Sequence, residues 1–298
     1  MKNLIYLLAT VLILTSCKNL EQDNNDAMSE TEAQAAMQDS LAALPEVKLH
    51  IFDGGSVLAK QKVMFSEGDR YEGESIQLAA PFYVIQHPEG TLLWDTGLPE
   101  GLVGQGDVTP EGDAFTISRS EKIVDQLASV GLTPADIDMI AFSHVHFDHT
   151  GGANNFANAK WLVQDTEMDF INSDAIKGNA FYAPDSFSKL SNSQILNGDY
   201  DIFSDGSVVI KSFPGHTAGH QALYLSLKES GPTLLSGDTY HFEQNREDAV
   251  VPQFNYDIPE SKTSIEEFEA FAKAKNATVI IQHDLEDFKS TVAKTPMK

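Results

Sequence analysis

Short apolar runs alternate with polar turns along the chain from residue 46 onward. Runs of this length, bounded by Gly, Pro, Asn or Asp, are typical of β-strands. The pattern therefore predicts a protein built largely on sheets. The segments expected to form strands are residues 47–52, 82–85, 91–94, 139–142, 161–163, 208–210, 222–227, 233–235 and 278–281.

Residues 120–130 and 264–274 have a different pattern, with apolar side chains at the spacing of one helix face. Gly131 follows the first of these segments, where a helix is expected to end. Groups of strands interleaved with such helices predict an α/β fold in which two sheets pack face to face with helices outside. The loops at the C-terminal ends of the strands are then the expected site of chemistry.

The N-terminus departs from this pattern. Lys2 precedes an apolar run over residues 4–14, which is too short to span a membrane and is typical of a signal peptide. The run ends in Leu-Thr-Ser-Cys, which resembles the lipobox of bacterial lipoproteins, and Cys17 is the only cysteine of the chain. We expect residues 1–16 to be a signal peptide and Cys17 to be lipidated. The exported protein would then be anchored to the cell envelope, on the periplasmic side or the surface, with secretion as the alternative.

The charge of the chain excludes one class of partner. The 298 residues include 44 Asp and Glu but only 20 Lys and Arg, so the formal net charge is −24. Nucleic acids would repel such a chain, since their binding depends on neutralised phosphates. Residues 17–45 are polar and acidic and are expected to be a tether, followed by one folded domain over residues 46–298. Membrane contact is expected only through the N-terminal lipid, and no pattern indicates an oligomeric state.

The strongest chemical signal is Ser-His-Val-His-Phe-Asp-His at residues 143–149, directly after the strand predicted for residues 139–142. Alternate side chains of an extended loop point to different sides. His144 and His146 could therefore hold one ion while Asp148 and His149 hold a second.

Three further strand ends carry potential ligands: His216, Asp238 and His283. Each follows a predicted strand, so all three are expected at one edge of the sheets. Five histidines and two aspartates are what two divalent ions need while leaving room for a bridging water. Imidazole and carboxylate suit Zn²⁺, Fe²⁺, Mn²⁺ and Co²⁺ alike, and zinc is the ion we expect. Since Cys17 is the only cysteine, the folded domain has no thiolate ligand and no cysteine nucleophile.

The sequence resembles the metallo-β-lactamase superfamily. The resemblance rests on His-x-His-x-Asp-His at residues 144–149, on Leu-Leu-Trp-Asp-Thr-Gly at residues 92–97, and on Pro-Gly-His-Thr-Ala-Gly-His at residues 214–220. It implies an αββα sandwich of two mixed sheets from residue 46 to the C-terminus. The ligands that it implies are His144, His146 and His216 for metal one, Asp148, His149 and His283 for metal two, and Asp238 as the bridge.

Two further residues are expected to support these ligands. His220 lies where that superfamily has a histidine that braces the metal site, although an ordinary hydrogen-bonded loop histidine is equally compatible with the sequence. Asp95 is expected to anchor a turn and to support the first ligand loop.

Two features narrow the resemblance to one branch. The absence of a cysteine ligand excludes one class of β-lactamases, and the cysteine-free class lacks a bridging carboxylate such as Asp238. Residues 144–154 and 237–257 resemble the N-acyl-homoserine lactonase branch, including exported lactonases of marine Bacteroidetes. The implied activity is quorum quenching: hydrolysis of the ester bond of a small, neutral lactone ring.

The implied chemistry uses a hydroxide that bridges two metal ions, because the ions lower the pKa of water and polarise the carbonyl. Lactonases of this branch have a tyrosine three residues after the bridging aspartate. That position is His241 here, with Tyr240 beside it, and either could hydrogen-bond the carbonyl oxygen. The catalytic candidates are Asp148, Asp238 (a proton carrier), Tyr240 and His241, and the candidates for contact with the acyl chain are Phe147, Met64 and Phe65.

Other functions use similar residues. An organophosphate or phosphotriester hydrolase, or a cysteine-free metallo-β-lactamase, could use the same pair of metal ions, and only the substrate profile would separate them. A metal-stabilised binding module is the alternative that is not an enzyme. An inactive site usually loses ligands, whereas all seven are present here.

Overall fold

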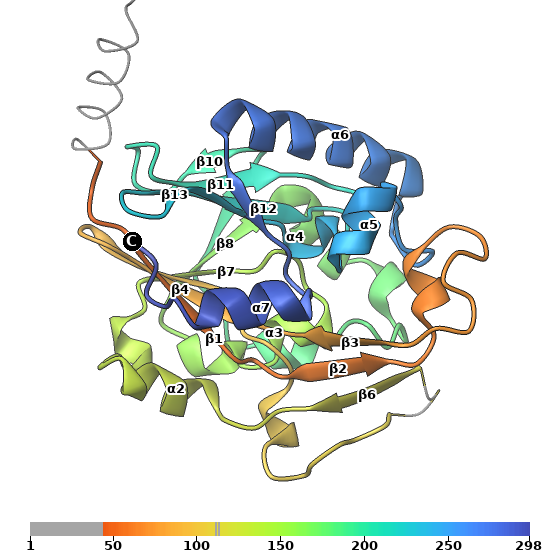
Figure 1. The fold of residues 1–298 in the computed structure, drawn as a ribbon. Helices are drawn as coiled ribbons and strands as arrows, with labels where there is room; N and C mark the ends of the chain where they lie inside the picture. Colours follow the sequence, from red (N-terminus) through yellow and green to blue (C-terminus); the bar gives the residue numbers. More distant parts are fainter. Residues whose placement is uncertain (1–43, 111, 113) are drawn as a thin grey trace, which may run out of the picture. The chain divides into compact units, whose positions relative to one another are not determined.

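Two β-sheets form the centre of this computed structural model, which describes residues 44–298 except residues 111 and 113 (Figure 1). The predicted signal peptide, Cys17 and almost all of the predicted tether lie outside the described residues. The six-stranded sheet has the order β1 (Lys48–Phe52), β4 (Phe82–His87), β5 (Gly90–Trp94), β7 (Met139–Ala141), β8 (Lys160–Gln164) and β9 (Ser193–Leu196). The five-stranded sheet has the order β10 (Tyr200–Asp201), β11 (Val208–Ser212), β12 (Gln221–Leu227), β13 (Gly231–Leu235) and β14 (Thr278–Ile280).

Both sheets are mixed. In the first, β1, β4 and β5 pair antiparallel, and β5, β7, β8 and β9 pair parallel. In the second, only the pair of β13 and β14 is parallel. A smaller sheet of β3 (Ile76–Ala79), β2 (Ser56–Ala59) and β6 (Phe115–Ser118) stands beside them.

The main core lies between the two large sheets. Ile51, Trp94 and Leu162 of the first sheet belong to the same buried cluster as Leu223 and Leu235 of the second. Further clusters bury the outer faces: α2 (Ile123–Ser129) packs on the first sheet, and α6 (Ile258–Lys275) packs on the second (Figure 1). The layers are therefore helix, sheet, sheet and helix, which confirms the predicted αββα sandwich. The remaining α-helices of the described residues are α3 (Phe147–Thr150), α4 (Asp165–Ile171), α5 (Glu243–Asp248) and α7 (Leu285–Val292).

The apolar runs locate the strands well. Every predicted strand is present, and its ends lie within two residues of the predicted ones. The second predicted helix begins earlier than expected, at Ile258, because the Asp257 side chain accepts a hydrogen bond from the Glu260 N–H and Pro259 occupies the first turn. The small sheet and the edge strands β9 and β10 were not predicted.

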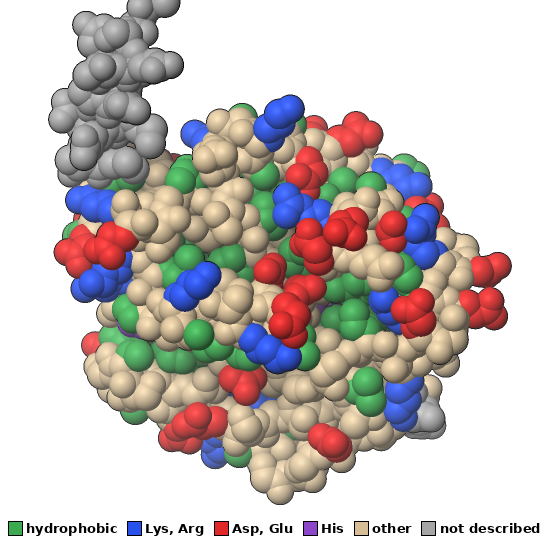
Figure 2. Space-filling view, viewed as in Figure 1, with side chains coloured by type: hydrophobic (Ala, Val, Ile, Leu, Met, Phe, Trp, Pro, Cys, Tyr) green, Lys and Arg blue, Asp and Glu red, His purple; other side chains and the backbone are tan. Residues whose placement is uncertain are grey.

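On the face that Figure 2 displays, acidic side chains are interspersed with Lys and Arg. Among residues 44–298, none of the helices has both the length and the apolar character needed to cross a bilayer.

Candidate metal centre

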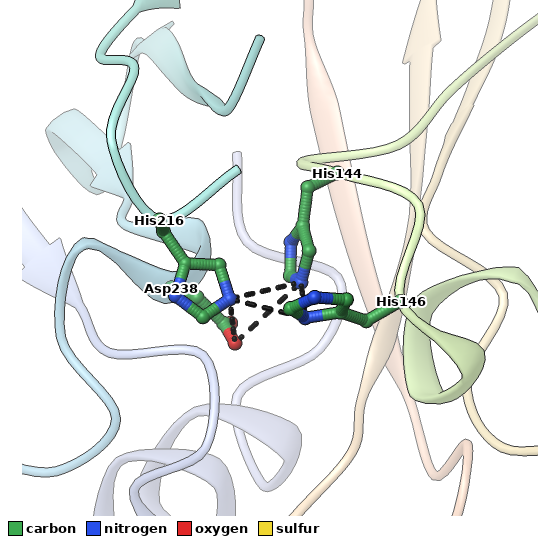
Figure 3. Close-up of side chains that lie close together, drawn as sticks. All are labelled: His144, His146, His216 and Asp238. Carbon is green, nitrogen blue, oxygen red and sulfur yellow. Dashed lines mark hydrogen bonds and ion pairs between the residues drawn. The ribbon is translucent and has the colours of Figure 1, made fainter. Parts of the chain in front are cut away.

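The seven predicted ligands meet at one end of the two large sheets. They follow the C-terminal ends of β7, β11, β13 and β14, as expected for side chains delivered to one edge. Within each of two groups the donor atoms lie within 4.8 Å of one another. The first group is His144, His146, His216 and Asp238 (Figure 3), and the second is Asp148, His149 and His283.

Three imidazole nitrogens converge in the first group. His144 Nε2 lies 2.7 Å from His146 Nδ1, and His216 Nε2 lies 3.2 Å from both atoms (Figure 3). A tetrahedral zinc site with bonds of about 2.0–2.1 Å separates its ligand atoms by about 3.3 Å. The two separations that involve His216 match this value, and the third is shorter, so the three nitrogens converge closely enough to share a divalent cation.

Asp238 lies between the two groups, with one carboxylate oxygen toward each. Its Oδ2 is 3.3 Å from His216 Nε2 and 3.7 Å from His144 Nε2. Its Oδ1 is 3.1 Å from His283 Nε2 and 3.4 Å from His149 Nε2. A carboxylate divided in this way is placed to bridge two cations.

Asp148 completes the second group. Its Oδ1 lies 3.8 Å from His149 Nε2, and its Oδ2 lies 3.7 Å from His283 Nε2. Among the described residues, His149 Nε2 and Asp238 Oδ1 are buried atoms without a hydrogen-bond partner. Buried polar atoms are rarely left without a partner, so these two atoms fit a second metal position.

The electrostatics of the cluster also favour cations. Burial lowers the pKa values of His144 and His216 well below the usual range, which keeps these imidazoles neutral and ready to bind metal. Burial alone would raise the pKa of Asp238, but His283 and His149 hold it well below its usual range. Burial would likewise lower the pKa of His149, yet the carboxylates of Asp238 and Asp95 raise it well above normal. The carboxylates therefore attract positive charge into a buried site.

Hydrogen bonds to the far ring nitrogens orient the ligands. Asp95 was predicted to support the first ligand loop. Its Oδ2 lies 3.1 Å from His149 Nδ1, and its Oδ1 accepts a hydrogen bond from the Ser143 N–H at 2.7 Å. His283 Nδ1 donates to the carbonyl oxygen of Ala79 at 2.6 Å. His216 Nδ1 lies 2.9 Å from Asn255 Oδ1. Each contact turns Nε2 toward the cluster.

His220 holds the backbone of Asp238 in place. Its Nδ1 donates to the Phe213 carbonyl at 2.9 Å, and its Nε2 accepts a bond from the Asp238 backbone N–H at 2.8 Å. The approach is so close that a Cβ at Gly237 would lie 2.6 Å from His220 Nε2, and Gly237 has a φ of +51°. A glycine is therefore required beside Asp238.

The structure separates the two oxyanion candidates. The Tyr240 hydroxyl points away from the cluster and lies 3.1 Å from Glu269 Oε1 in α6. His241 Nε2 lies 3.1 Å from Asp238 Oδ2. Successive side chains point in opposite directions here because Tyr240 has extended backbone angles. Of the two candidates, only His241 therefore lies beside the ligand cluster.

The residues predicted to contact the acyl chain line cavities beside the cluster. Phe65 and Phe147 line a small one together with Asp148, Asp238, His241 and His283. Met64 and Phe147 line a second one of about 250 Å³, which is walled mainly by apolar side chains, including Phe115, Ile117 and Phe181. Phe115, Phe147 and Phe181 border both cavities. The three predicted acyl-chain residues thus surround a space that begins at the metal ligands.

Comparison with known proteins gives consistent matches. The model of the metallo-beta-lactamase superfamily matches residues 77–283, a segment that contains all seven ligands. An N-acyl homoserine lactonase of Bacillus thuringiensis is 31% identical over 228 residues, which cover 73% of this chain and 86% of the relative. The N-acyl homoserine lactonase AttM of Rhizobium radiobacter is 28% identical over 251 residues, which cover 81% of this chain and 94% of the relative.

A solved structure supports the same grouping. It is an N-acyl homoserine lactone hydrolase with the product N-hexanoyl-L-homoserine bound at its catalytic metal centre. Its sequence is 29% identical to this chain, the TM-score is 0.72, and the match covers 83% of this chain and 97% of that one.

Proposed function

Because the chain belongs to the metallo-β-lactamase superfamily, we propose that it hydrolyses the lactone ring of N-acyl-homoserine lactones with two divalent metal ions, zinc in the native protein. The observation that carries this proposal is the division of the Asp238 carboxylate between two groups of ligands. Its relatives from Bacillus thuringiensis and Rhizobium radiobacter are N-acyl homoserine lactonases. A product-bound neighbour carries an acyl-homoserine at its metal centre.

The ligands divide into two sets. His144, His146 and His216 would hold one ion, Asp148, His149 and His283 the other, and Asp238 both. Ions in these positions supply a nucleophilic water at neutral pH and polarise the ester carbonyl.

Two side chains of the cluster then act on the substrate. His241 faces the same space as Asp238, where its Nε2 can donate a hydrogen bond to the lactone carbonyl oxygen as negative charge develops there. The Asp238 carboxylate can carry a proton to the ring oxygen that leaves.

The acyl chain fits the apolar cavity beside the cluster. Phe147 borders both this cavity and the small space at the ligands, so a substrate whose ester lies at the metals can extend its chain past Phe147 toward Met64. Burying each CH₂ group of such a chain is worth about 0.8 kcal/mol. A neutral head group and an apolar tail also suit an acidic protein, which would repel an anionic substrate.

The test of this function is proton release. Ring opening produces a carboxylic acid, so the zinc-loaded full chain is mixed with a long-chain N-acyl-homoserine lactone in weak buffer, and acid production is followed. Rapid release is expected from the wild type and from Asp125→Asn, which changes an exposed aspartate in α2. Asp238→Asn is expected to reduce the rate at least about 100-fold, because loss of a supporting contact alone costs 10- to 100-fold.

A substrate panel identifies the alternatives. Zinc-loaded wild type that releases no acid from lactones but hydrolyses a phosphotriester or a β-lactam would contradict the lactonase proposal while leaving the metal centre intact. Zinc-loaded protein that hydrolyses none of these substrates would favour the binding-module interpretation.

We also propose that the enzyme is exported and anchored to the cell envelope through Cys17. This proposal rests on the apolar run of residues 4–14 and on the position of the single cysteine directly after it. Incorporation of labelled fatty acid into the wild type, and its loss in Cys17→Ser, is the expected result. An unlabelled wild-type protein in the culture medium would instead support secretion.

A further inference from the structure

A buried carboxylate outside the ligand set joins the two loops that carry the histidines of the first group. Glu167 lies in α4 and is only 2% exposed. Its Oε1 accepts a hydrogen bond from the Val145 N–H at 3.1 Å, and its Oε2 accepts one from the Gly219 N–H at 2.7 Å. Neither contact belongs to the regular hydrogen bonding of a helix or a sheet.

Each of these N–H groups belongs to a loop that carries predicted metal ligands. Val145 stands between His144 and His146 in the first ligand loop, residues 143–149, which follows β7. Gly219 is three residues after His216 in the second ligand loop, residues 213–220, which connects β11 to β12. Since β7 and β11 belong to different sheets, Glu167 connects loops that follow strands of both sheets.

The second ligand loop packs against α4 without a gap. A Cβ at Gly219 would lie 2.6 Å from both the Cβ and the backbone N of Glu167, so any larger residue would push the loop away. Gln164, at the end of β8, adds a parallel connection: its Nε2 donates to Gln221 Oε1, and Gln221 Nε2 donates to the Phe142 carbonyl, each at 2.9 Å. The separation of the two loops is therefore fixed by specific contacts.

We propose that Glu167 is a positioning residue that sets the distance of His144 and His146 from His216, and thereby the affinity of the metal position these three histidines form. The inference rests on the metal-binding part of the proposed function. Imidazoles on loops that follow strands of two different sheets can bind one ion tightly only if the loops are held at the correct spacing.

The effect is expected at one metal position only. The ligands of the second group have other supports: His149 contacts Asp95, and His283 donates to the Ala79 carbonyl. The hydrogen bonds of Glu167 go instead to the backbone N–H groups of Val145 and Gly219. A change at Glu167 should therefore weaken one of two bound ions and leave the other as it was.

Glu167→Gln is the informative substitution because it preserves shape. Each carboxylate oxygen of Glu167 accepts a hydrogen bond from a backbone N–H group. The amide of a glutamine has only one oxygen, so in either orientation its NH₂ group faces one of these N–H donors and that hydrogen bond is lost. The matched control is Glu100→Gln. Glu100 also accepts a backbone N–H, from Ile123, and a side-chain N–H, from Asn155, but it does not contact either ligand loop.

The experiment measures zinc affinity and not turnover. The full-length chains are loaded with zinc, the bound equivalents are counted, and each equivalent is titrated against a chelator of known affinity. We expect Glu167→Gln to bind one equivalent 10- to 100-fold more weakly, with the other unchanged, and Glu100→Gln to match the wild type at both. In a His283→Ala background, which damages the second position, the weakening should appear in the equivalent that remains.

Two results would contradict the proposed role of Glu167. Wild-type affinity for both ions in Glu167→Gln, or equal weakening of both, would overturn the positioning role. Glu167→Asp supplies a second variant if Glu167→Gln does not fold, since its shorter side chain draws the carboxylate away from the Val145 and Gly219 N–H groups and should give the same selective loss. If the wild type is zinc-loaded and hydrolyses lactones while both variants bind zinc normally, only this inference fails; a wild type that binds no zinc overturns the proposed function itself.

Discussion

At the scale of single residues, the position three residues after the bridging aspartate distinguishes this chain from the lactonase pattern. His241 occupies it, and its Nε2 is 3.1 Å from Asp238 Oδ2. The sequence could not choose between His241 and Tyr240, because the choice depends on which of two neighbours in an extended segment faces the ligands. The hydrogen bond of Tyr240 to Glu269 joins residues 29 positions apart, and no local pattern predicts such a contact.

A pair of substitutions tests the role of His241. His241→Phe removes the hydrogen-bond donor and is expected to lower kcat for lactones about 100-fold, the usual effect of losing one oxyanion donor. Tyr240→Phe is the matched control, since it removes a hydroxyl that bonds to Glu269 and should leave kcat near the wild-type value. Steady-state kinetics of zinc-loaded protein gives both values. A large loss in Tyr240→Phe with little change in His241→Phe would reverse the assignment.

The acyl-chain cavity gives a second prediction at this scale. Met64 lines the cavity of about 250 Å³, and its backbone is held by hydrogen bonds to Gln61 and Gln253 that do not involve its side chain. Met64→Trp should fill part of the cavity, raising KM for a long-chain lactone about tenfold and leaving KM for a short-chain one unchanged. A tenfold change corresponds to about 1.4 kcal/mol, roughly two buried CH₂ groups. Equal effects on both substrates would show that the chain lies elsewhere.

Other supporting residues could not be found from the sequence for the same reason. The carboxylate of Glu167 and the side-chain amide of Asn255 each reach the ligand loops from distant parts of the chain. By contrast, the ligands of residues 144–149 were evident because their spacing is local. His216, Asp238 and His283 could be predicted because each directly follows an apolar strand.

At the scale of elements, strands were predicted better than helix ends or small sheets. Buried strands such as β12 are apolar on both faces, so their whole length is visible as a hydrophobic run. The strands of the small sheet have only four residues each and include partly exposed positions, so they give a weaker signal. That sheet nevertheless matters for function, because β6 supplies Phe115 and Ile117 to the cavity.

One contact between elements gives a pH-dependent prediction. Arg246 of α5 donates from Nε to Glu269 Oε1 of α6 at 2.8 Å and from Nη2 to Oε2 at 3.1 Å. The hydrogen bonds from Arg246 lower the pKa of Glu269 below its usual value of 4.5. Since the folded protein binds this proton less readily than the unfolded chain, the contact stabilises the fold above pH 4.5 and loses its effect as the pH falls through the lowered pKa.

The measurement compares wild type with Glu269→Gln. Unfolding free energies should differ by up to about 1 kcal/mol at neutral pH, a value kept small because the pair is partly exposed, and should converge in acid. Denaturant unfolding at both pH values gives the difference. A gap that widens as the pH falls would contradict the sign.

At the scale of the whole molecule, the metal ligands come from both sheets. His144, His146 and His149 follow a strand of the first sheet, whereas His216, Asp238 and His283 follow strands of the second. The order of these segments along the chain and the αββα layering could be predicted from the sequence. How the sheets align across their shared core could not, because that alignment depends on side-chain packing between segments far apart in the chain.

Metal removal should therefore destabilise the entire domain. An ion present at 100 times its Kd stabilises the folded state by about 2.7 kcal/mol. Chelation is expected to lower the Tm of the zinc-loaded chain, and added zinc should restore it, as measured by calorimetry. An unchanged Tm after complete removal of zinc would show that the two sheets do not depend on bound metal.

The proposed lactonase activity is tested most directly by the identity of the reaction product. The zinc-loaded chain is incubated with an N-acyl-homoserine lactone in ¹⁸O-labelled water, and the products are resolved by mass spectrometry. A lactonase is expected to form one product, the ring-opened N-acyl-homoserine with a single labelled oxygen in its new carboxylate. Asp238→Asn is expected not to form this product. Recovery of the intact lactone, or of a free fatty acid beside homoserine lactone, would contradict a lactonase at this site.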